Sequence, residues 1–163
     1  MPHPVFNYSN ISQLTWFNRS EINQIFVKNS REAIVILKDK VEITINRNQL
    51  KPIIEEKRSK SSEGLQVKES EGFYLVKNPQ KNTRYTVHPK SDHLFCNCSD
   101  YRNQYNAFES NQVACKHVFA VLGYLGFSSL KEYANFVDDQ IAEQAIAHIE
   151  MMNQYFELQH GGY

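Results

Sequence analysis

The sequence lacks the features that define several classes of protein. It has no apolar run approaching the ~18 residues needed to cross a bilayer, and its start, Met1-Pro2-His3-Pro4, has no basic region followed by an apolar stretch. Lys plus Arg and Asp plus Glu both number 18, so a histone-like polybasic protein is excluded. We therefore expect an intracellular, cytoplasmic protein that has no membrane partner.

Sequence motifs of common enzymes are also missing. There is no Gly-Lys-Ser/Thr loop of the kind that cradles phosphate, and no Gly-x-Ser-x-Gly elbow of the kind that presents a nucleophile. We therefore expect that the protein is not an enzyme and takes no small-molecule substrate.

Cysteine is scarce, and its placement argues against disulfides. The three cysteines are Cys96, Cys98 and Cys115, an odd number with two of them a single residue apart. In a reducing cytosol such thiols stay available as thiolate ligands. His117 follows Cys115 at the same spacing that separates Cys96 from Cys98. This Cys/His cluster is the most informative feature of the sequence.

Three thiolates and one imidazole are the donor set of a structural, four-coordinate Zn(II) site. Residues two apart on a strand point to the same face, so Cys96 and Cys98 can converge at a strand end. Residues two apart on a helix point about 200° apart, so we expect Cys115 just before a helix and His117 in its first turn. The alternative is a set of buried, unliganded thiols beside a capping histidine.

A catalytic zinc keeps one position open to water, whereas four protein ligands fill the shell here. His88 and His93 lie near the cluster in sequence and could replace a ligand. We favour the interpretation that both are turn histidines that face water. This interpretation leaves the zinc with a structural role.

The hydrophobic patterning predicts an α+β fold, and the length of 163 residues suits one domain with a small appended module. In the first part we expect a helix at 20–27 capped by Ser20, a β-hairpin of strands at 33–37 and 41–45, and a helix from Asn46 to about residue 57. In the second part we expect strands at 72–77, 84–88 and 93–96, a polar stretch at 99–112, a helix ending at Gly126, and helices from 130 to about 158.

The pattern Cys-x-Cys, a gap, then Cys-x-His resembles the SWIM zinc finger over about residues 72–126. The matching segments are Phe95-Cys96-Asn97-Cys98 and Ala114-Cys115-Lys116-His117-Val118-Phe119-Ala120-Val121-Leu122. The resemblance implies a ββα arrangement, in which the first ligand pair lies on a β-hairpin and the second at the start of a helix. It also implies a zinc cofactor and the binding of DNA or proteins, as proposed for SWIM modules of chromatin remodellers, transposase relatives and recombination mediators.

With this resemblance, the chain divides into four predicted segments. They are an N-terminal α+β segment at 1–58 with a β-hairpin and short helices, a linker at 59–71, a SWIM-like zinc-finger module at 72–126, and a C-terminal helical segment at 127–163. The chain is too short to hold a helicase, transposase or kinase domain as well. We therefore expect a stand-alone SWIM protein that works within a larger assembly.

Charge is unevenly distributed, with a net +5 over residues 38–90 and −5 over residues 121–163. Basic residues on the predicted strands could contact phosphate, and aromatic residues in the polar stretch could stack on bases or pin the loop by packing. The candidate nucleic-acid contacts are Lys77, Lys81, Arg84, Lys90, Arg102, Tyr101 and Tyr105. A second basic group, which we interpret as a solvated helix end and linker, comprises Lys51, Lys57, Arg58 and Lys60.

These observations predict a nucleic-acid-binding or DNA-processing accessory subunit, with DNA or RNA and a partner protein as its ligands. The alternative function is that of a protein–protein adaptor. In that case the zinc finger is a rigid scaffold, and the acidic C-terminal helices dock the partner.

Overall fold

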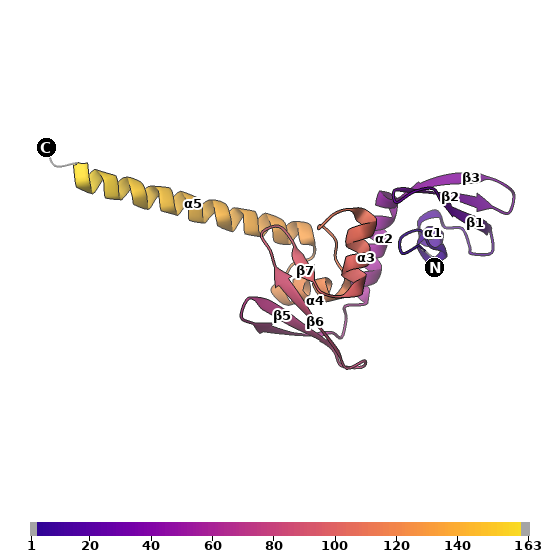
Figure 1. The fold of residues 1–163 in the computed structure, drawn as a ribbon, viewed down its shortest axis with the longest axis horizontal. Helices are drawn as coiled ribbons and strands as arrows, with labels where there is room; N and C mark the ends of the chain where they lie inside the picture. Colours follow the sequence, from indigo (N-terminus) through magenta and orange to yellow (C-terminus); the bar gives the residue numbers. More distant parts are fainter. Residues whose placement is uncertain (1–2, 161–163) are drawn as a thin grey trace.

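Two antiparallel β-sheets and five helices make up residues 3–160, the part of the chain described by the computed structural model (Figure 1). The predicted α+β class is therefore confirmed. The first half contains α1 (Tyr8–Thr15), β1 (Ile22–Val27), β2 (Glu32–Leu37), β3 (Glu42–Asn46) and α2 (Arg47–Lys60). The second half contains β4 (Gln66–Ser70), β5 (Phe73–Asn78), β6 (Thr83–Pro89), β7 (Leu94–Cys96), α3 (Ser99–Phe108), α4 (Lys116–Leu125) and α5 (Leu130–His160).

The first sheet has the strand order β1-β2-β3 and includes the predicted hairpin as β2 and β3. Along β2, Ala33, Val35 and Leu37 are buried, and the residues between them are partly exposed. This period of two is the signature of a strand with one face on the core. The sheet therefore buries one face, as the apolar–polar alternation at 41–45 predicts for this hairpin.

Residues 20–27 do not form the predicted helix, because Ile22–Val27 is strand β1. A tight turn returns the chain from β1 to β2, and in this turn the Asn29 side chain accepts hydrogen bonds from the amides of Arg31 and Glu32. β1 then pairs with β2 along most of its length. Pairing with a neighbouring strand therefore outweighs the local helix signal of Ser20, since strand formation is decided by cross-strand packing.

The predicted helix after Asn46 is α2, and its start has the expected cap. The Asn46 side chain accepts from the Asn48 amide at 2.9 Å, and the Gln49 side chain accepts from the Asn46 amide at 2.8 Å. Such reciprocal capping satisfies amides that have no partner within the helix. α2 then packs against both α1 and α4 and so connects the two halves of the molecule.

The second sheet has the strand order β4-β5-β6-β7, and its last three strands are those predicted. Strand β4 lies within the stretch 59–71, for which we expected a linker, and pairs with β5. Val76 and Val87 are fully buried on the inner face, against which α4 packs. The core of the protein is continuous from this sheet through α2 to the first sheet.

The polar stretch 99–112 contains a helix, α3, that the sequence patterning did not predict. Its buried residues are Tyr101, Gln104, Ala107 and Phe108. Their spacing of three and four is helical, so a signal was present. It was obscured because the N-cap position is occupied by Cys98, which is not one of the residues that usually cap a helix.

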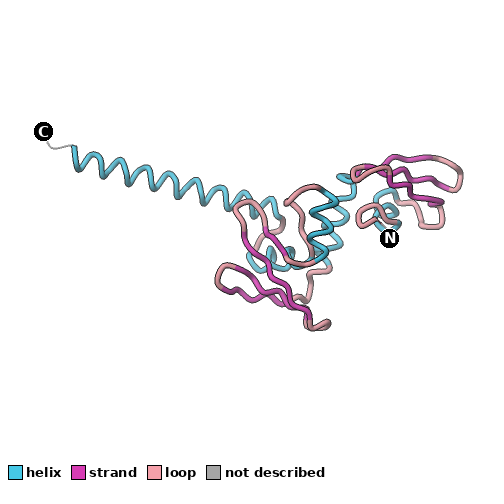
Figure 2. Tube along the Cα trace, in the orientation of Figure 1, coloured by secondary structure: helices cyan, strands magenta, loops and turns pink. Residues whose placement is uncertain are grey.

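The C-terminal helix α5 leaves the body of the protein and extends outward along its length (Figure 2). Leu130 and Tyr133 are buried, whereas every residue from Asp138 to Met152 is exposed. None of the helices in the described part of the chain is long and apolar enough to span a membrane.

Candidate metal centre

The four predicted ligands come together from three elements of the second half. Cys96 ends strand β7, Cys98 is the N-cap of α3, Cys115 is the N-cap of α4, and His117 lies in the first turn of α4. This is the placement that the one-residue spacings predict for Cys115 and His117. All four side chains are at least 97% buried.

The donor atoms are close enough to share one ion. All four lie within 4.8 Å of one another, and the Nδ1 atom of His117 is 3.7 Å from the Sγ of Cys96 and 3.8 Å from the Sγ of Cys115. In a tetrahedral zinc site with ordinary bond lengths, nitrogen and sulfur ligands are about 3.6 Å apart. The cluster therefore fits a tetrahedral ion of the size of zinc.

Without a cation, three thiols this close cannot all be ionised. Burial raises the pKa of the Cys115 thiol far above its usual range. The hydrogen bond from Cys115 holds the pKa of Cys98 well below its usual range. The cluster thus favours one thiolate that is stabilised by its protonated neighbours, and a divalent cation would stabilise all three thiolates.

Two helix N-termini point at the cluster, and both favour negative charge on sulfur. The amide of Tyr101, in the first turn of α3, donates to Cys98 Sγ at 3.3 Å. Cys115 occupies the corresponding position at the start of α4. The sequence patterning predicted only the N-terminus of α4 at the cluster, because α3 was not predicted.

The ring of His117 is held by its surroundings as well as by the cluster. Tyr85 on β6 stacks on it with ring centroids 4.3 Å apart and an interplanar angle of 29°. The second ring nitrogen, Nε2, is buried and has no hydrogen-bond partner among residues 3–160. Nδ1 faces the sulfurs of Cys96 and Cys115, so it is the nitrogen that a metal in the cluster would contact. A cluster of three thiols and one imidazole, buried and converging, matches the donor set of structural zinc.

Two arginines from α2 fix the helix that carries the Cys98 cap. Arg58 forms a two-point contact with Asp100 at the start of α3, with distances of 2.7 and 3.1 Å. Arg47 donates to the carbonyl of Ala107 near the helix end at 2.8 Å. A bidentate arginine–carboxylate contact restricts orientation as well as distance. The metal centre is thereby tied to the first half of the chain.

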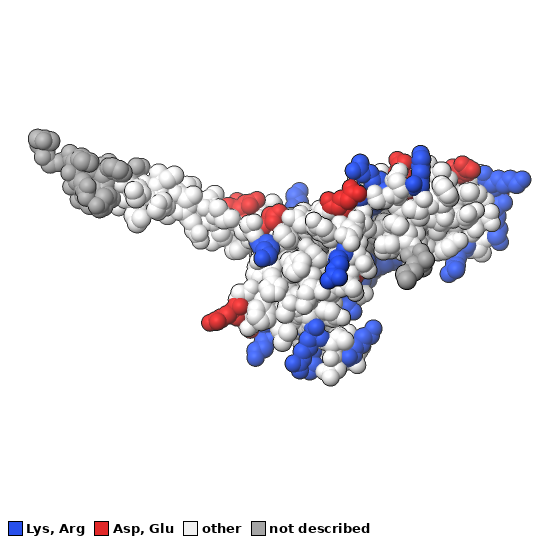
Figure 3. Space-filling view, viewed as in Figure 1, with Lys and Arg blue, Asp and Glu red and all other residues white. Residues whose placement is uncertain are grey.

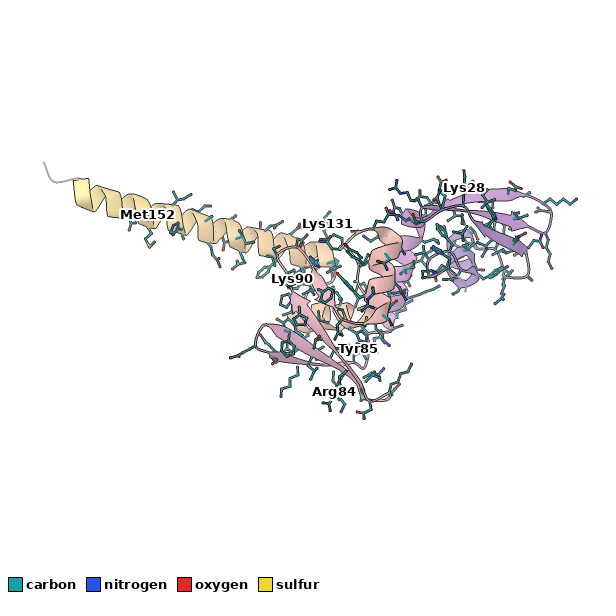
Figure 4. All side chains as sticks on the ribbon, in the orientation of Figure 1. Lys28, Arg84, Tyr85, Lys90, Lys131 and Met152 are labelled. Atoms are coloured by element: carbon teal, nitrogen blue, oxygen red, sulfur yellow. The ribbon has the colours of Figure 1, made fainter. Side chains whose placement is uncertain are left out.

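The predicted nucleic-acid residues do not form a single group. Lys77 and Arg84 are paired neighbours on β5 and β6, and Lys81 lies in the turn between these strands. Lys90 follows the opposite end of β6 (Figure 4), which places it about 20 Å from Arg84 along the strand.

The other three candidates lie on α3. Arg102 and Tyr105 are exposed, whereas Tyr101 is only 3% exposed and its hydroxyl donates to the carbonyl of Asn111. Exposed Phe95 on β7 contacts the ring of Tyr101 edge-on at 5.4 Å. Phe95 was not among the predicted contacts, although its place between Leu94 and Cys96 on a short strand implies that it faces outward.

The four residues of the basic group on α2 are all engaged in contacts within the protein. Lys51 and Lys60 pair with Glu55 and Glu56 within the helix. Lys57 donates to the side chains of Ser9 and Asn10, and Arg58 binds Asp100. We expected a solvated helix end and linker, but all four residues lie within α2, and Lys57 and Arg58 bind residues of α1 and α3.

Comparison with known proteins gives no relative: no family model, no curated protein and no solved structure matches this chain. The chain is a mixed α+β protein with a buried Cys₃His cluster that could hold a metal ion and is compatible with a zinc finger.

Proposed function

We propose that this protein is a zinc-stabilised, non-catalytic nucleic-acid-binding module that works as an accessory subunit of a DNA-processing assembly. The observation that carries the proposal is a group of uncompensated cations on the outward face of the second sheet. This face is the side of β4–β7 opposite α4. Its cations are Lys68, Lys77 and Arg84.

The charge of this face has one sign. The outward positions of the four strands are Gln66, Lys68, Ser70, Phe73, Leu75, Lys77, Arg84, Thr86, His88 and Phe95, which include no Asp or Glu. Within residues 3–160, none of the three cations has an ion-pair partner. Figure 3 shows Lys and Arg side chains gathered around the β5–β6 turn, at the lower end of this sheet. Such a face suits a phosphate backbone.

The SWIM resemblance supports the same function. We infer that β6, β7 and α4 correspond to its ββα arrangement, with the zinc held by Cys96, Cys98, Cys115 and His117. Four protein ligands leave no coordination position for a substrate or water. In this proposal, zinc therefore orders the sheet and does not take part in a reaction.

Fluorescence anisotropy of the zinc-loaded protein with labelled DNA and RNA, over a salt series, tests the proposal. Binding should weaken steeply with salt. The variant Lys77→Ala/Arg84→Ala should bind more weakly, with a log–log salt slope smaller by about 0.7 for each cation that contacts a single strand. Lys28→Ala/Lys38→Ala is the matched control, since it removes two cations that directly follow β1 and β2 of the first sheet. A folded, zinc-loaded protein that binds no oligonucleotide at low salt would contradict the proposal.

A protein adaptor is the second candidate, and α5 favours it. Ile141, Ile149 and Met152 lie on one side of this helix at helical spacing and are 52%, 58% and 40% exposed. An isolated amphipathic helix gains most of its stability by packing its apolar side. A pull-down in which deletion of residues 138–163 removes a protein partner but leaves oligonucleotide binding intact would assign α5 to that partner.

A further inference from the structure

Three aromatic rings lie in a row across the outward face of the second sheet. Phe73, His88 and Phe95 occupy facing positions on β5, β6 and β7, because His88 pairs with Phe95 and the pairing of Tyr74 with Val87 places Phe73 opposite His88. The ring centroids of Phe73 and His88 are 5.6 Å apart, and those of His88 and Phe95 are 6.3 Å apart. We call these three residues the ring row.

The ring row is accessible to a ligand. Phe95 is 41% exposed, and Phe73 and His88 are half-buried by their neighbours. In the described part of the chain, α4 packs on the inner face and α3 contacts the sheet at β7. The buried ring of Tyr101 on α3 contacts Phe95 edge-on and holds it in place. The rings are therefore ordered before any ligand arrives, which lowers the entropy cost of binding.

The cations lie beside the rings on the same face. Lys77 and Arg84 are paired four positions along the strands from the ring row, a distance of about 13 Å. Lys68 lies between them and the rings, since it pairs with Leu75. A polyanion that follows the cations would therefore pass within a few nucleotides of the rings.

A nucleic acid that binds both the rings and the cations must have bases whose faces are free to stack on the rings. In a duplex the bases are stacked on one another, so their faces are hidden and a protein reaches only their edges. Successive bases of one duplex strand are also about 3.4 Å apart, which is shorter than the 5.6 and 6.3 Å spacing of the rings. An unpaired strand can separate its bases and stack them on protein rings.

The ring row ends at a pocket that suits the edge of a base. The pocket has a volume of about 300 Å³, and its lining includes Phe95, Asn97, Tyr101, Arg102, Tyr105 and Asn111. It combines an exposed ring with amide and guanidinium groups. These groups can hydrogen-bond to the polar edge of a base whose face lies against a ring. Two candidates from the sequence, Arg102 and Tyr105, thereby join the same surface as Phe95.

We propose that the outward face of the second sheet binds single-stranded DNA or RNA, with unpaired bases on the ring row and the backbone along Lys68, Lys77 and Arg84. This inference rests on the proposed function and names its ligand class. A surface that acted through charge alone would prefer the duplex, whose charge density is higher. Preference for a single strand therefore separates stacking from simple attraction.

Fluorescence anisotropy of the full-length, zinc-loaded protein tests this inference with four labelled probes of about 15 nucleotides. They are oligothymidine, oligouridine, a duplex, and an abasic strand that has phosphates but no bases. Oligothymidine or oligouridine should bind more tightly than the duplex and the abasic strand. Phe95→Ala should weaken single-strand binding about tenfold without changing the salt slope, and Phe95→Trp should restore it. The relative affinities of oligothymidine and oligouridine distinguish DNA from RNA.

Phe26→Ala is the matched control, because Phe26 is an exposed phenylalanine on a strand of the other sheet. Its affinity for single strands should equal that of the unmodified protein. The inference is overturned if the duplex or the abasic strand binds as tightly as oligothymidine, or if Phe95→Ala and Phe26→Ala behave alike. In either case binding itself would survive, whereas failure to bind any probe at low salt would reject the proposed function.

Discussion

Cys98 combines two roles, because its sulfur caps α3 and also belongs to the four-ligand cluster. Serine is a good N-cap but a poor zinc ligand. A serine at this position would therefore preserve the cap and remove the metal ligand. Loss of structure in this variant would therefore come from the missing metal ligand and not from the missing cap.

We expect Cys98→Ser and His117→Ala to lose zinc and the native structure of residues 94–125. Structural zinc contributes on the order of 10 kcal/mol in small zinc modules, which is comparable to the whole stability of a domain. Native mass spectrometry measures the zinc, and hydrogen exchange measures the structure. His148→Ala, an exposed histidine on α5, is the control and should retain both. Retention of native exchange in Cys98→Ser without bound zinc would show that the metal is dispensable.

Glu109 joins the first sheet to the end of α3, and this contact predicts a pH dependence. Hydrogen bonds from Arg31, Ser30 and Arg47 lower the pKa of Glu109 below its ordinary value of 4.5. A lowered folded-state pKa stabilises the protein above the unfolded value, and this contribution is lost as the pH falls through the folded value.

The stability of the unmodified protein should therefore fall more steeply between about pH 5 and pH 3 than that of Glu109→Gln. Chemical unfolding at several pH values measures the difference. Glu143→Gln on α5 is the control, since Glu143 makes no ion pair within the described residues. Equal slopes for the unmodified protein and Glu109→Gln would mean that Glu109 does not contribute.

At the scale of elements, α5 is divided between a packed start and an exposed remainder. Leu130 and Tyr133 are buried, and the Tyr133 hydroxyl donates to the carbonyl of Lys90. Beyond Val137 the helix has no buried residue up to Met152. The part of α5 from 138 to 152 therefore contributes little to the stability of the folded body.

Deletion of residues 138–163 should leave the free energy of unfolding unchanged within about 0.5 kcal/mol, because residues 138–152 are all exposed. Denaturant unfolding and zinc content are the measurements. A longer deletion that also removes Leu130 and Tyr133 should destabilise the protein clearly. A large loss of stability in the shorter deletion would reveal contacts that α5 makes in solution.

Helices and strands could be predicted from the sequence where a single local pattern, such as an apolar run or a helix cap, specifies them. The β-rich apolar run at 33–37 predicts β2, and the Asn46 cap predicts the start of α2. Strand β1 and helix α3 were mispredicted because pairing and packing with distant residues determine both. In α3, Arg58 and Arg47 bind the two ends of the helix from elsewhere in the chain.

At the scale of the whole molecule, the metal centre and the proposed binding face are two sides of one sheet. Cys96 faces inward on β7 toward the cluster, and its neighbour Phe95 faces outward in the ring row. Loss of the metal should therefore disturb the outward face. We expect a chelator to weaken single-strand binding more than tenfold and added zinc to restore it, as measured by anisotropy.

Magnesium is the control for this experiment. Mg²⁺ prefers oxygen ligands and should not bind a cluster of three sulfurs and one nitrogen. Added Mg²⁺ should therefore not restore single-strand binding. Binding that survives complete removal of zinc would show that the outward face is ordered without the metal.

The four candidate metal ligands, and the strand and helix that place Cys96, Cys115 and His117, could be predicted from the sequence. The reason is that a spacing of one residue restricts where two side chains can point, whatever the rest of the chain does. Which cations lack an acidic partner depends on the folded structure and could not be predicted from the sequence. Lys57 and Arg58 are engaged by residues far away in the sequence, whereas Lys77 and Arg84 meet no carboxylate within residues 3–160. The ring row likewise depends on strand register, which brings Phe73, His88 and Phe95 together from three strands.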